Sequence, residues 1–240
     1  MERAEWLQQM KKKAENLYDH LSPQYWISFG LAPNETHLAY LQKFLLGMPP
    51  KSMLLSAGCG AGRYDGILLE AGHWVVGIDQ SAGMLKRAKE HFPEVQYEQR
   101  CLQEMEFCEK FDGAICVDAM EHISPEDWPQ IMRRFQEALK PGGELYLTVD
   151  LAEGDDLPGA YERAQALGLP VVIGEVVDQV EDAYEQVTTS DQILRERCDV
   201  AIYHYHPSLE QVRMWIEEAG MSIEAEGSGN GYEHLLARKK

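Results

Sequence analysis

The feature that most constrains the fold is a glycine-rich turn between two apolar segments. The turn lies in Leu54-Leu55-Ser56-Ala57-Gly58-Cys59-Gly60-Ala61-Gly62-Arg63, and a second apolar run, Trp74–Ile78, ends at Asp79. A strand, a glycine turn, a helix and a second strand that ends in an acid open a nucleotide-binding α/β sheet. Asp79 follows Gly58 by 21 residues, so its carboxylate can accept both hydroxyls of a ribose. The pattern therefore predicts a cofactor that contains adenosine.

The spacing of the glycines narrows the choice of cofactor. Dinucleotide-binding turns read G-x-G-x-x-G and hold a pyrophosphate at a helix N-terminus, whereas this turn reads G-x-G-x-G. That spacing resembles the glycine loop of the class I S-adenosylmethionine-dependent methyltransferases. In that family the loop holds the methionine part of the cofactor, which carries no phosphate. The resemblance is good over residues 50–150 and weak near the C-terminus.

The resemblance implies an α/β fold with a Rossmann-like sheet of seven strands. The family order is 3-2-1-4-5-7-6, and only strand 7 is antiparallel. Apolar runs and turn signals predict strands at 52–56, 73–78, 95–100, 111–117, 144–149, 221–226 and 232–238. Ser124-Pro125-Glu126-Asp127 predicts the start of a helix with Ser124 as its N-cap. The glycine-rich segment 227–231 predicts the loop between the last two strands.

We expect a single methyltransferase domain over residues 1–240, with two additions to the sheet. Apolar stripes near 3–20 and 35–46 predict helices, and the resemblance implies that residues 1–47 form a lid over the cofactor. Residues 151–206 are expected to form a cap inserted after the fifth strand. Its first part, 151–200, carries 12 acids and 3 arginines, and the runs 171–177 and 200–206 predict a small sheet.

Composition bears on partners and location. The net charge of −18 and the pI near 4.8 disfavour nucleic acids and anionic membranes, which bind proteins through basic surfaces. The five cysteines form no C-x-x-C pair, as is typical of free thiols in a reducing compartment. Without a signal-like N-terminus or a long apolar run, the sequence predicts a cytoplasmic protein. It does not predict an oligomeric state.

The cofactor contacts should lie just beyond the carboxyl ends of the strands, where open α/β sheets bind their ligands. The resemblance also places Met84 and Leu102 beside the adenine and two lid tyrosines over the cofactor. The cofactor-binding residues expected in this way are Ser56, Ala57, Gly58, Cys59, Gly60, Gly62, Asp79, Gln80, Met84, Cys101, Leu102, Val117, Tyr18 and Tyr25. Ser56 and Cys101 stand where the family usually carries acids. For Met84 and the tyrosines, simple core packing is the alternative.

The candidate catalytic residues lie in Asp118-Ala119-Met120-Glu121-His122, directly after the fourth strand. This run is similar to the Glu-x-x-Glu-His of ubiquinone-biosynthesis O-methyltransferases, with Asp118 in place of the first Glu. The likeness implies that His122 is a general base and that Glu121 orients it or lines the pocket. Two alternatives remain open. Asp118, Glu121 and His122 could bind a divalent metal, with magnesium favoured by the resemblance, or Glu121 and His122 could cap the following turn.

Candidate substrate contacts come from the run Ile202-Tyr203-His204-Tyr205-His206 and from the lid. The two-residue period of a strand puts both histidines on one face and both tyrosines on the other. His204 and His206 would then form a polar rim of the substrate pocket, and Trp26 is the candidate from the lid. The alternative is an exposed edge strand with half-buried tyrosines.

The sequence thus predicts an enzyme that transfers a methyl group from S-adenosylmethionine to a small molecule, with a hydroxyl oxygen as the favoured acceptor. Two rival functions belong to other classes. One is a non-catalytic protein that binds or senses S-adenosylmethionine, which the changes at Ser56 and Cys101 allow. The other is an NAD-dependent oxidoreductase, which the glycine spacing disfavours.

Overall fold

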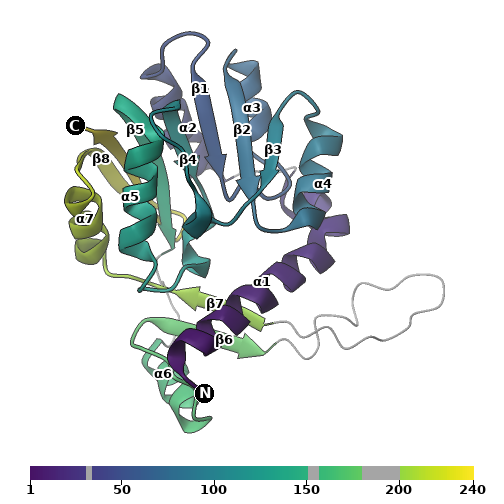
Figure 1. Cartoon of the computed structure of the whole chain (residues 1–240), viewed down its shortest axis with the longest axis vertical. Coiled ribbons are helices and arrows are strands. Elements are labelled where there is room, and N and C mark those ends of the chain that lie inside the picture. Colours follow the sequence, from purple (N-terminus) through teal and green to yellow (C-terminus); the bar gives the residue numbers. More distant parts are fainter. Residues whose placement is uncertain (31–33, 151–156, 180–200) are drawn as a thin grey trace, which may run out of the picture.

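The computed structural model describes residues 1–30, 34–150, 157–179 and 201–240. It contains a seven-stranded sheet in the order β3-β2-β1-β4-β5-β9-β8, shown in Figure 1. The strands are β1 (Met53–Ala57), β2 (Trp74–Asp79), β3 (Gln96–Gln99), β4 (Phe111–Cys116), β5 (Leu139–Asp150), β8 (Met221–Gly229) and β9 (Tyr232–Lys239). β9 pairs antiparallel with both β5 and β8, and the other pairs are parallel. The predicted Rossmann-like sheet is therefore confirmed.

Both faces of the central strands are buried, so the sheet is the middle layer of three. Leu54 and Leu55, neighbours in β1, are 0% exposed and belong to two separate apolar clusters, because alternate side chains of a strand point to opposite faces. α5 and α7 supply one cluster, and α2 and α3 supply the other. The helices of these layers are α2 (Glu35–Leu46), α3 (Asp65–Glu70), α4 (Ala82–His91), α5 (Trp128–Ala138) and α7 (Leu209–Glu218).

The long N-terminal helix α1 (Arg3–Tyr25) does not lie in either layer. It crosses beyond the carboxyl ends of the parallel strands, as Figure 1 shows, and packs against α4 and β7. Trp6, Met10, Ala14 and Leu17 form its buried stripe, in agreement with the predicted helical period. A short π-helical turn, η1 (Trp26–Gly30), follows. α1 thus covers the edge of the sheet at which open α/β sheets bind their ligands.

A small unit is inserted between β5 and α7. It contains α6 (Leu157–Ala166) and an antiparallel pair, β6 (Glu175–Gln179) and β7 (Ala201–Tyr205). A small sheet thus forms, but its first strand begins at Glu175 rather than at residue 171. Glu175 is 0% exposed and accepts hydrogen bonds from Arg3 of α1 and from the Tyr203 hydroxyl. These bonds tie the start of α1 to the inserted pair. Residues 151–156 and 180–200 contain most of the acids of the expected cap. They lie outside the described residues, and so do the predictions made for them.

Several predicted boundaries were wrong. The fifth strand begins at Leu139 rather than at residue 144, because Leu139 already pairs with Phe111 of β4. α5 begins at Trp128 rather than after Ser124, because residues 124–127 close a turn in which the Asp127 N–H donates to the Ser124 carbonyl. The segment 227–231 is not a loop, because β8 continues to Gly229 and only Asn230 and Gly231 form the turn.

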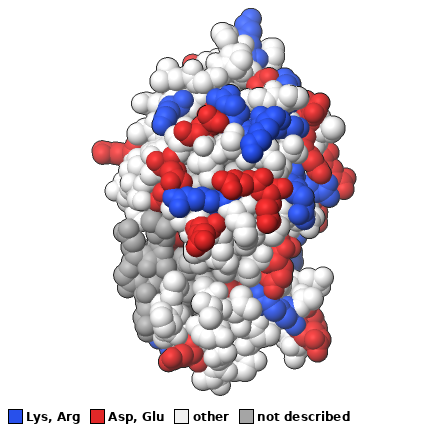
Figure 2. Space-filling model, turned by 90° about the vertical axis from the view of Figure 1, so that its left-hand side faces the viewer, with Lys and Arg blue, Asp and Glu red and all other residues white. Residues whose placement is uncertain are grey.

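Three further facts bear on partners and location. None of the described helices is both long and apolar enough to cross a bilayer. The described cysteines, Cys59, Cys101, Cys108 and Cys116, form no disulfide, and Cys198 lies outside the described residues. On the face in Figure 2, acidic and basic side chains alternate, so its described part offers no continuous basic patch of the kind that nucleic acids bind.

Candidate active site

The glycine turn after β1 is shaped by two close approaches. Gly58 has φ +64°, and a Cβ at this position would lie 2.5 Å from the Cβ of Ala119, so no larger residue fits. Gly60 has φ +52° and donates its N–H to Oδ2 of Asp79 at 2.9 Å. Only glycine adopts this left-handed backbone at no steric cost. The two glycines therefore bring the main chain against the end of β4 and against the acid of β2.

Asp79 ends β2 and lies beside this turn, as its spacing predicted. Its second oxygen accepts the N–H of Ser81 at 2.8 Å. Burial raises the pKa of the Asp79 carboxyl, and the N–H groups of Ser81 and Gly60 oppose the shift. The Ser81 side chain in turn accepts the N–H of Met84 and caps α4. The carboxylate is thus fixed in direction by backbone donors.

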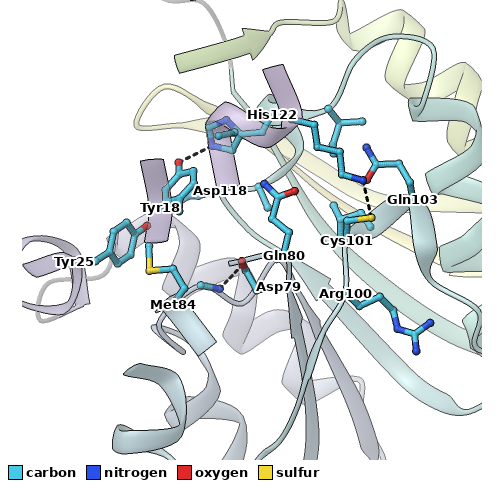
Figure 3. A pocket seen from close by; sticks show the side chains of 17 residues that line it. Tyr18, Tyr25, Asp79, Gln80, Met84, Arg100, Cys101, Gln103, Asp118 and His122 are labelled. Carbon is cyan, nitrogen blue, oxygen red and sulfur yellow. Dashed lines mark hydrogen bonds between the residues drawn. The ribbon is translucent and has the colours of Figure 1, made fainter. Parts of the chain in front are cut away.

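A cleft of about 720 Å³ opens beyond this edge of the sheet, and Figure 3 shows the side chains that face it. Most predicted cofactor residues meet there. Those lining it are Tyr18, Tyr25, Gly58, Gly60, Asp79, Gln80, Met84, Cys101 and Leu102. An adjoining recess is lined by Ser56, Ala57, Cys59 and Val117. Gly62 lines neither space and packs near Phe92 and Tyr97.

The two departures from the family pattern have identifiable neighbours. Ser56 is buried beside Asp65, which is 0% exposed and accepts the Tyr97 hydroxyl at 2.8 Å. Burial raises the pKa of Asp65 to about 6, although the hydroxyls of Ser56 and Tyr97 favour its ionised form. Cys101 accepts a hydrogen bond from Lys11 of α1 at 2.9 Å. An acid thus lies near Ser56, supplied by α3, whereas the Cys101 contact ties the cleft to α1.

The raised pKa of Asp65 predicts a measurable effect on stability. Burial favours its protonated form, so this carboxyl costs stability as pH rises from about 4 through about 6. Asp65→Asn should therefore gain up to about 3 kcal/mol relative to wild type over that range. Urea unfolding at several pH values measures the difference. Asp112→Asn is the control of opposite sign, because Lys140 lowers the pKa of Asp112, so its replacement should cost stability near neutral pH. A pH-independent difference for Asp65→Asn would contradict the argument.

His122 is held between two oxygen atoms in a way that defines its tautomer. Its Nδ1 lies 3.2 Å from the Tyr203 carbonyl, and its Nε2 lies 2.7 Å from the Tyr18 hydroxyl. A carbonyl can only accept, so Nδ1 carries the proton and Nε2 accepts from Tyr18. Burial lowers the pKa of His122, which keeps the ring neutral. The lone pair of Nε2 therefore points at the Tyr18 hydroxyl, and Figure 3 shows this bond at the wall of the cleft.

A second cavity adjoins the cleft and shares part of its lining. Tyr18, Tyr25, Asp118 and His122 line both spaces. The other residues around the second cavity are Leu17, Leu21, Ser28, Phe29, Asn34, His37, Arg63, Glu121, Ile202, His204, Asn230 and Tyr232. The predicted base thus lies at the junction of two cavities, which is where a group could pass from one bound molecule to another.

Asp118 is paired with Arg63, and Glu121 makes no hydrogen bond to His122. Asp118 has φ +52° and accepts a hydrogen bond from Arg63 at 2.9 Å. Glu121 lines the second cavity, as predicted, but its nearest oxygen is 3.9 Å from Nε2 of His122. Burial and the charge of Asp118 raise the pKa of Glu121 to about 8. The Tyr203 carbonyl, not Glu121, orients the imidazole.

The ligand atoms of Asp118, Glu121 and His122, the alternative metal site, do not all lie within 4.8 Å of one another. Among the described residues, the ligand atoms that converge are those of Asp150, His204 and His206. The alternation predicted for β7 holds: Tyr203 and Tyr205 are 3% exposed, and His204 lines the second cavity. Burial and the neighbouring histidines lower the pKa of His204 to about 3.

Trp26, the other predicted substrate contact, lies elsewhere. Its ring stacks on His91 of α4 with centroids 3.9 Å apart and meets Phe92 edge-on. It lines neither the cleft nor the second cavity. The Trp26 side chain therefore packs η1 against α4.

The sequence reasoning missed three contributors to the site. Arg63 follows Gly62 directly and pairs with Asp118, so its position after the glycine turn was a usable signal. Asp150 ends β5, and the rule that ligands lie beyond strand ends would have found it. The sequence could not indicate the Tyr203 carbonyl, because every residue has a main-chain carbonyl group.

Comparison with known proteins gives this geometry a family. The methyltransferase domain family matches residues 54–143, from β1 into β5. A curated ubiquinone biosynthesis O-methyltransferase from Haemophilus ducreyi is 30% identical over 205 residues, which are 76% of this chain and 80% of the relative. The chain belongs to the class I S-adenosylmethionine-dependent methyltransferases.

Other relatives of this methyltransferase are more distant or shorter matches. The enzyme of the same name from Histophilus somni is 30% identical over 125 residues, covering 48% of this chain and about half, 51%, of the relative. A solved methyltransferase from Methanosarcina mazei has a TM-score of 0.65 at 16% identity and covers 88% of this chain and 99% of its own. Such low identity shows a common fold. As a family member, the chain is an enzyme whose cofactor is S-adenosylmethionine, and the NAD-dependent alternative is set aside.

Proposed function

We propose that this methyltransferase transfers the methyl group of S-adenosylmethionine to a hydroxyl oxygen of a small molecule. The observation that carries the proposal is the hydrogen bond between the Tyr18 hydroxyl and Nε2 of His122 at the junction of the two cavities. A buried, neutral imidazole that accepts a hydroxyl hydrogen is already arranged as a general base for a hydroxyl.

The cofactor would occupy the cleft beside the glycine turn. In this arrangement the Asp79 carboxylate would accept the ribose hydroxyls, and Met84 and Leu102, which line the cleft, would flank the adenine. The main chain at Gly58 and Gly60 would hold the methionine part, because these residues have no side chains. Tyr18 and His122 line both cavities and would lie between the cofactor and the acceptor.

The reaction needs one proton acceptor and an aligned pair of reactants. The acceptor hydroxyl would displace the Tyr18 hydroxyl from Nε2 of His122, which has a single lone pair. It would then give its proton to Nε2 while its oxygen forms a bond to the methyl carbon. The carbon–sulfur bond breaks, and its electron pair stays on sulfur as S-adenosylhomocysteine leaves. Holding oxygen and methyl in line contributes several kcal/mol by itself. The Nδ1 bond to Tyr203 stabilises the imidazolium that forms.

Two facts support a small hydroxylated acceptor. The second cavity is lined by polar side chains of α1, β7 and η3 (Met120–His122), among them Tyr18, His204 and Glu121, which can form hydrogen bonds with a hydroxylated molecule. The curated relatives from Haemophilus ducreyi and Histophilus somni are both named as O-methyltransferases. Their acceptors belong to ubiquinone biosynthesis, and we extend to this chain only the hydroxyl chemistry.

An acceptor panel tests the proposal. The purified protein is incubated with methyl-labelled S-adenosylmethionine and matched phenols, amines and thiols that share one ring scaffold. We expect label in the phenols, recovered as methyl ethers by mass spectrometry, at rates at least about tenfold above those of the amines and thiols. Preferential labelling of nitrogen or sulfur would overturn the choice of acceptor.

A further inference from the structure

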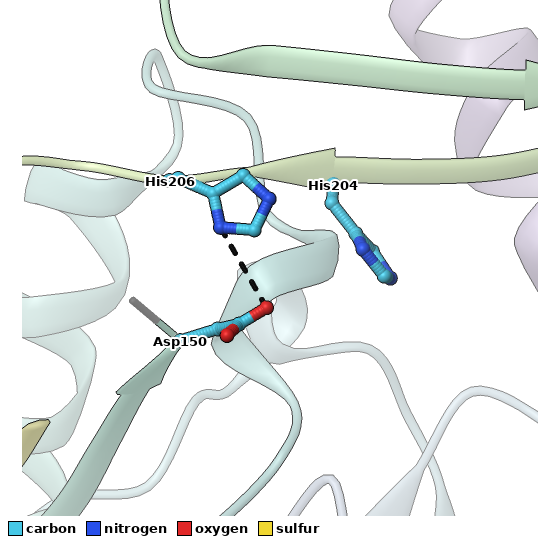
Figure 4. A group of neighbouring side chains, drawn as sticks. All are labelled: Asp150, His204 and His206. Carbon is cyan, nitrogen blue, oxygen red and sulfur yellow. Dashed lines mark ion pairs between the residues drawn. The ribbon is translucent and has the colours of Figure 1, made fainter. Parts of the chain in front are cut away.

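Three side chains converge beside the second cavity without being part of the proposed base. His204 and His206 project from one side of β7, and Asp150 ends β5, as Figure 4 shows. One ligand atom of each lies within 4.8 Å of the other two. Both histidines lie more than 50 positions after Asp150 in the sequence, so the fold brings the carboxylate and the imidazoles together.

The bonding of His206 is incomplete. Its side chain is 5% exposed, and its buried Nδ1 makes no hydrogen bond with any described residue. The nearest carboxylate oxygen, Oδ2 of Asp150, is 3.6 Å away, which is beyond hydrogen-bond length. A buried polar atom without a partner is costly, and here it points at two other potential ligands.

We propose that Asp150, His204 and His206 bind a divalent transition-metal ion, with Zn²⁺ as the first candidate. Imidazole nitrogen suits zinc and its neighbours in the first transition row, and a carboxylate completes a common three-ligand set. Around zinc, with bonds of about 2.0–2.2 Å, ligand atoms lie roughly 3.4 Å apart. Small side-chain rotations bring the three groups to that spacing.

The position of the site suggests what the ion does. His204 lines the second cavity, and its ring centroid is 4.9 Å from that of His122. Three protein ligands leave a coordination position open, which an oxygen of the acceptor can fill. The ion would then hold that oxygen beside the base and lower the pKa of its hydroxyl. This role rests on the proposed function, whereas the binding of the ion does not.

The binding test uses the full chain without any acceptor. After dialysis against EDTA and then buffer, the protein is titrated with ZnCl₂ in a calorimeter and with CoCl₂ in a spectrophotometer. We expect one ion per chain and a visible cobalt absorption. His206→Ala and Asp150→Asn should each weaken zinc binding by about 100-fold or more, since even residues that only support metal ligands are worth 10–100-fold. His20→Ala, an exposed histidine on α1, is the matched control.

Several outcomes would overturn the site. Wild-type protein that binds no zinc, or that binds it as tightly after His206→Ala, would show that the three residues are not ligands. Loss of zinc in His122→Ala with retention in His206→Ala would instead locate the ion at Asp118, Glu121 and His122. Calorimetry with S-adenosylhomocysteine on each variant verifies that the cofactor cleft is intact.

A second measurement separates the ion from its role. Methyl transfer is assayed with the EDTA-treated protein, with and without added ZnCl₂, under conditions where S-adenosylhomocysteine affinity is unchanged. Loss of transfer that zinc restores supports coordination of the acceptor. Zinc binding without any effect on transfer would overturn the role while the site stands, and transfer to no hydroxyl in the acceptor panel would reject the proposed function instead.

Discussion

His122→Ala is expected to lower turnover by about two orders of magnitude or more while the affinity for S-adenosylhomocysteine stays unchanged. The imidazole is the proton acceptor at the junction of the two cavities, and its Nε2 already receives a hydrogen bond from Tyr18. With alanine at this position, no side chain receives the proton of the acceptor hydroxyl. Burial raises the pKa of Tyr18 well above its ordinary value, so the phenol cannot replace the lost base. Steady-state kinetics with a methylated phenol as product, together with calorimetry, measure both quantities.

The controls for this prediction separate catalysis from packing. Tyr18→Phe keeps the ring against His122, with centroids that lie 5.2 Å apart in the wild type, and removes only the hydroxyl. We expect it to retain most of the turnover if the acceptor hydroxyl bonds His122 directly, and to lose as much as His122→Ala if Tyr18 relays the proton. His20→Ala should behave as wild type. Full activity of His122→Ala would exclude the imidazole as the base.

Asp79→Ala is expected to weaken binding of S-adenosylhomocysteine by about 100-fold. Two ribose hydroxyls donating to a carboxylate contribute about 1.5 kcal/mol or more each, and every 1.4 kcal/mol is tenfold in affinity. The substitution also frees the N–H of Gly60, which Asp79 holds at 2.9 Å, so the glycine turn loses an anchor. Isothermal titration with S-adenosylhomocysteine measures the affinity, and circular dichroism checks the fold.

Asp112→Ala is the matched control for that experiment. Asp112 is also an aspartate of the sheet that accepts a backbone N–H, from Met53 at 2.8 Å, but it lies in β4 and lines neither the cleft nor the second cavity. Its replacement should leave the affinity within about threefold of wild type. Equal affinities of the Asp79 and Asp112 variants would mean that the ribose is not held at the end of β2.

The parts of the site that local sequence defines were predictable. The glycine turn, Asp79 and the Ser81 cap depend on residues close together in one βαβ unit, whose geometry is stereotyped. The same holds for the position of His122 after β4. The capping box at Ser208 and Gln211 is another local feature, because both of its hydrogen bonds join residues three positions apart.

Contacts between distant segments decided what was missed. Gly227 and Gly229 suggested a loop, yet a Cβ there would lie 2.4 Å from the Tyr40 hydroxyl and 2.6 Å from Thr36. They are strand residues that admit close packing of α2. Ser124 and Pro125 imitate a helix start, but Pro129 one turn later sits in the first turn of α5. For the glycines the deciding neighbours are far away in the chain, whereas the helix start is decided by Pro129, which competes with Pro125 for the first turn.

The inserted strand β7 acts on the site through the main chain of one residue and the side chain of the next. Its main chain, at the Tyr203 carbonyl, fixes which nitrogen of His122 is protonated, and His204, the next residue, extends its side chain into the second cavity. Exchanging this segment for that of a relative would therefore alter acceptor selectivity and base strength in one step. Engineering one of these traits through this segment would therefore require re-optimising the other.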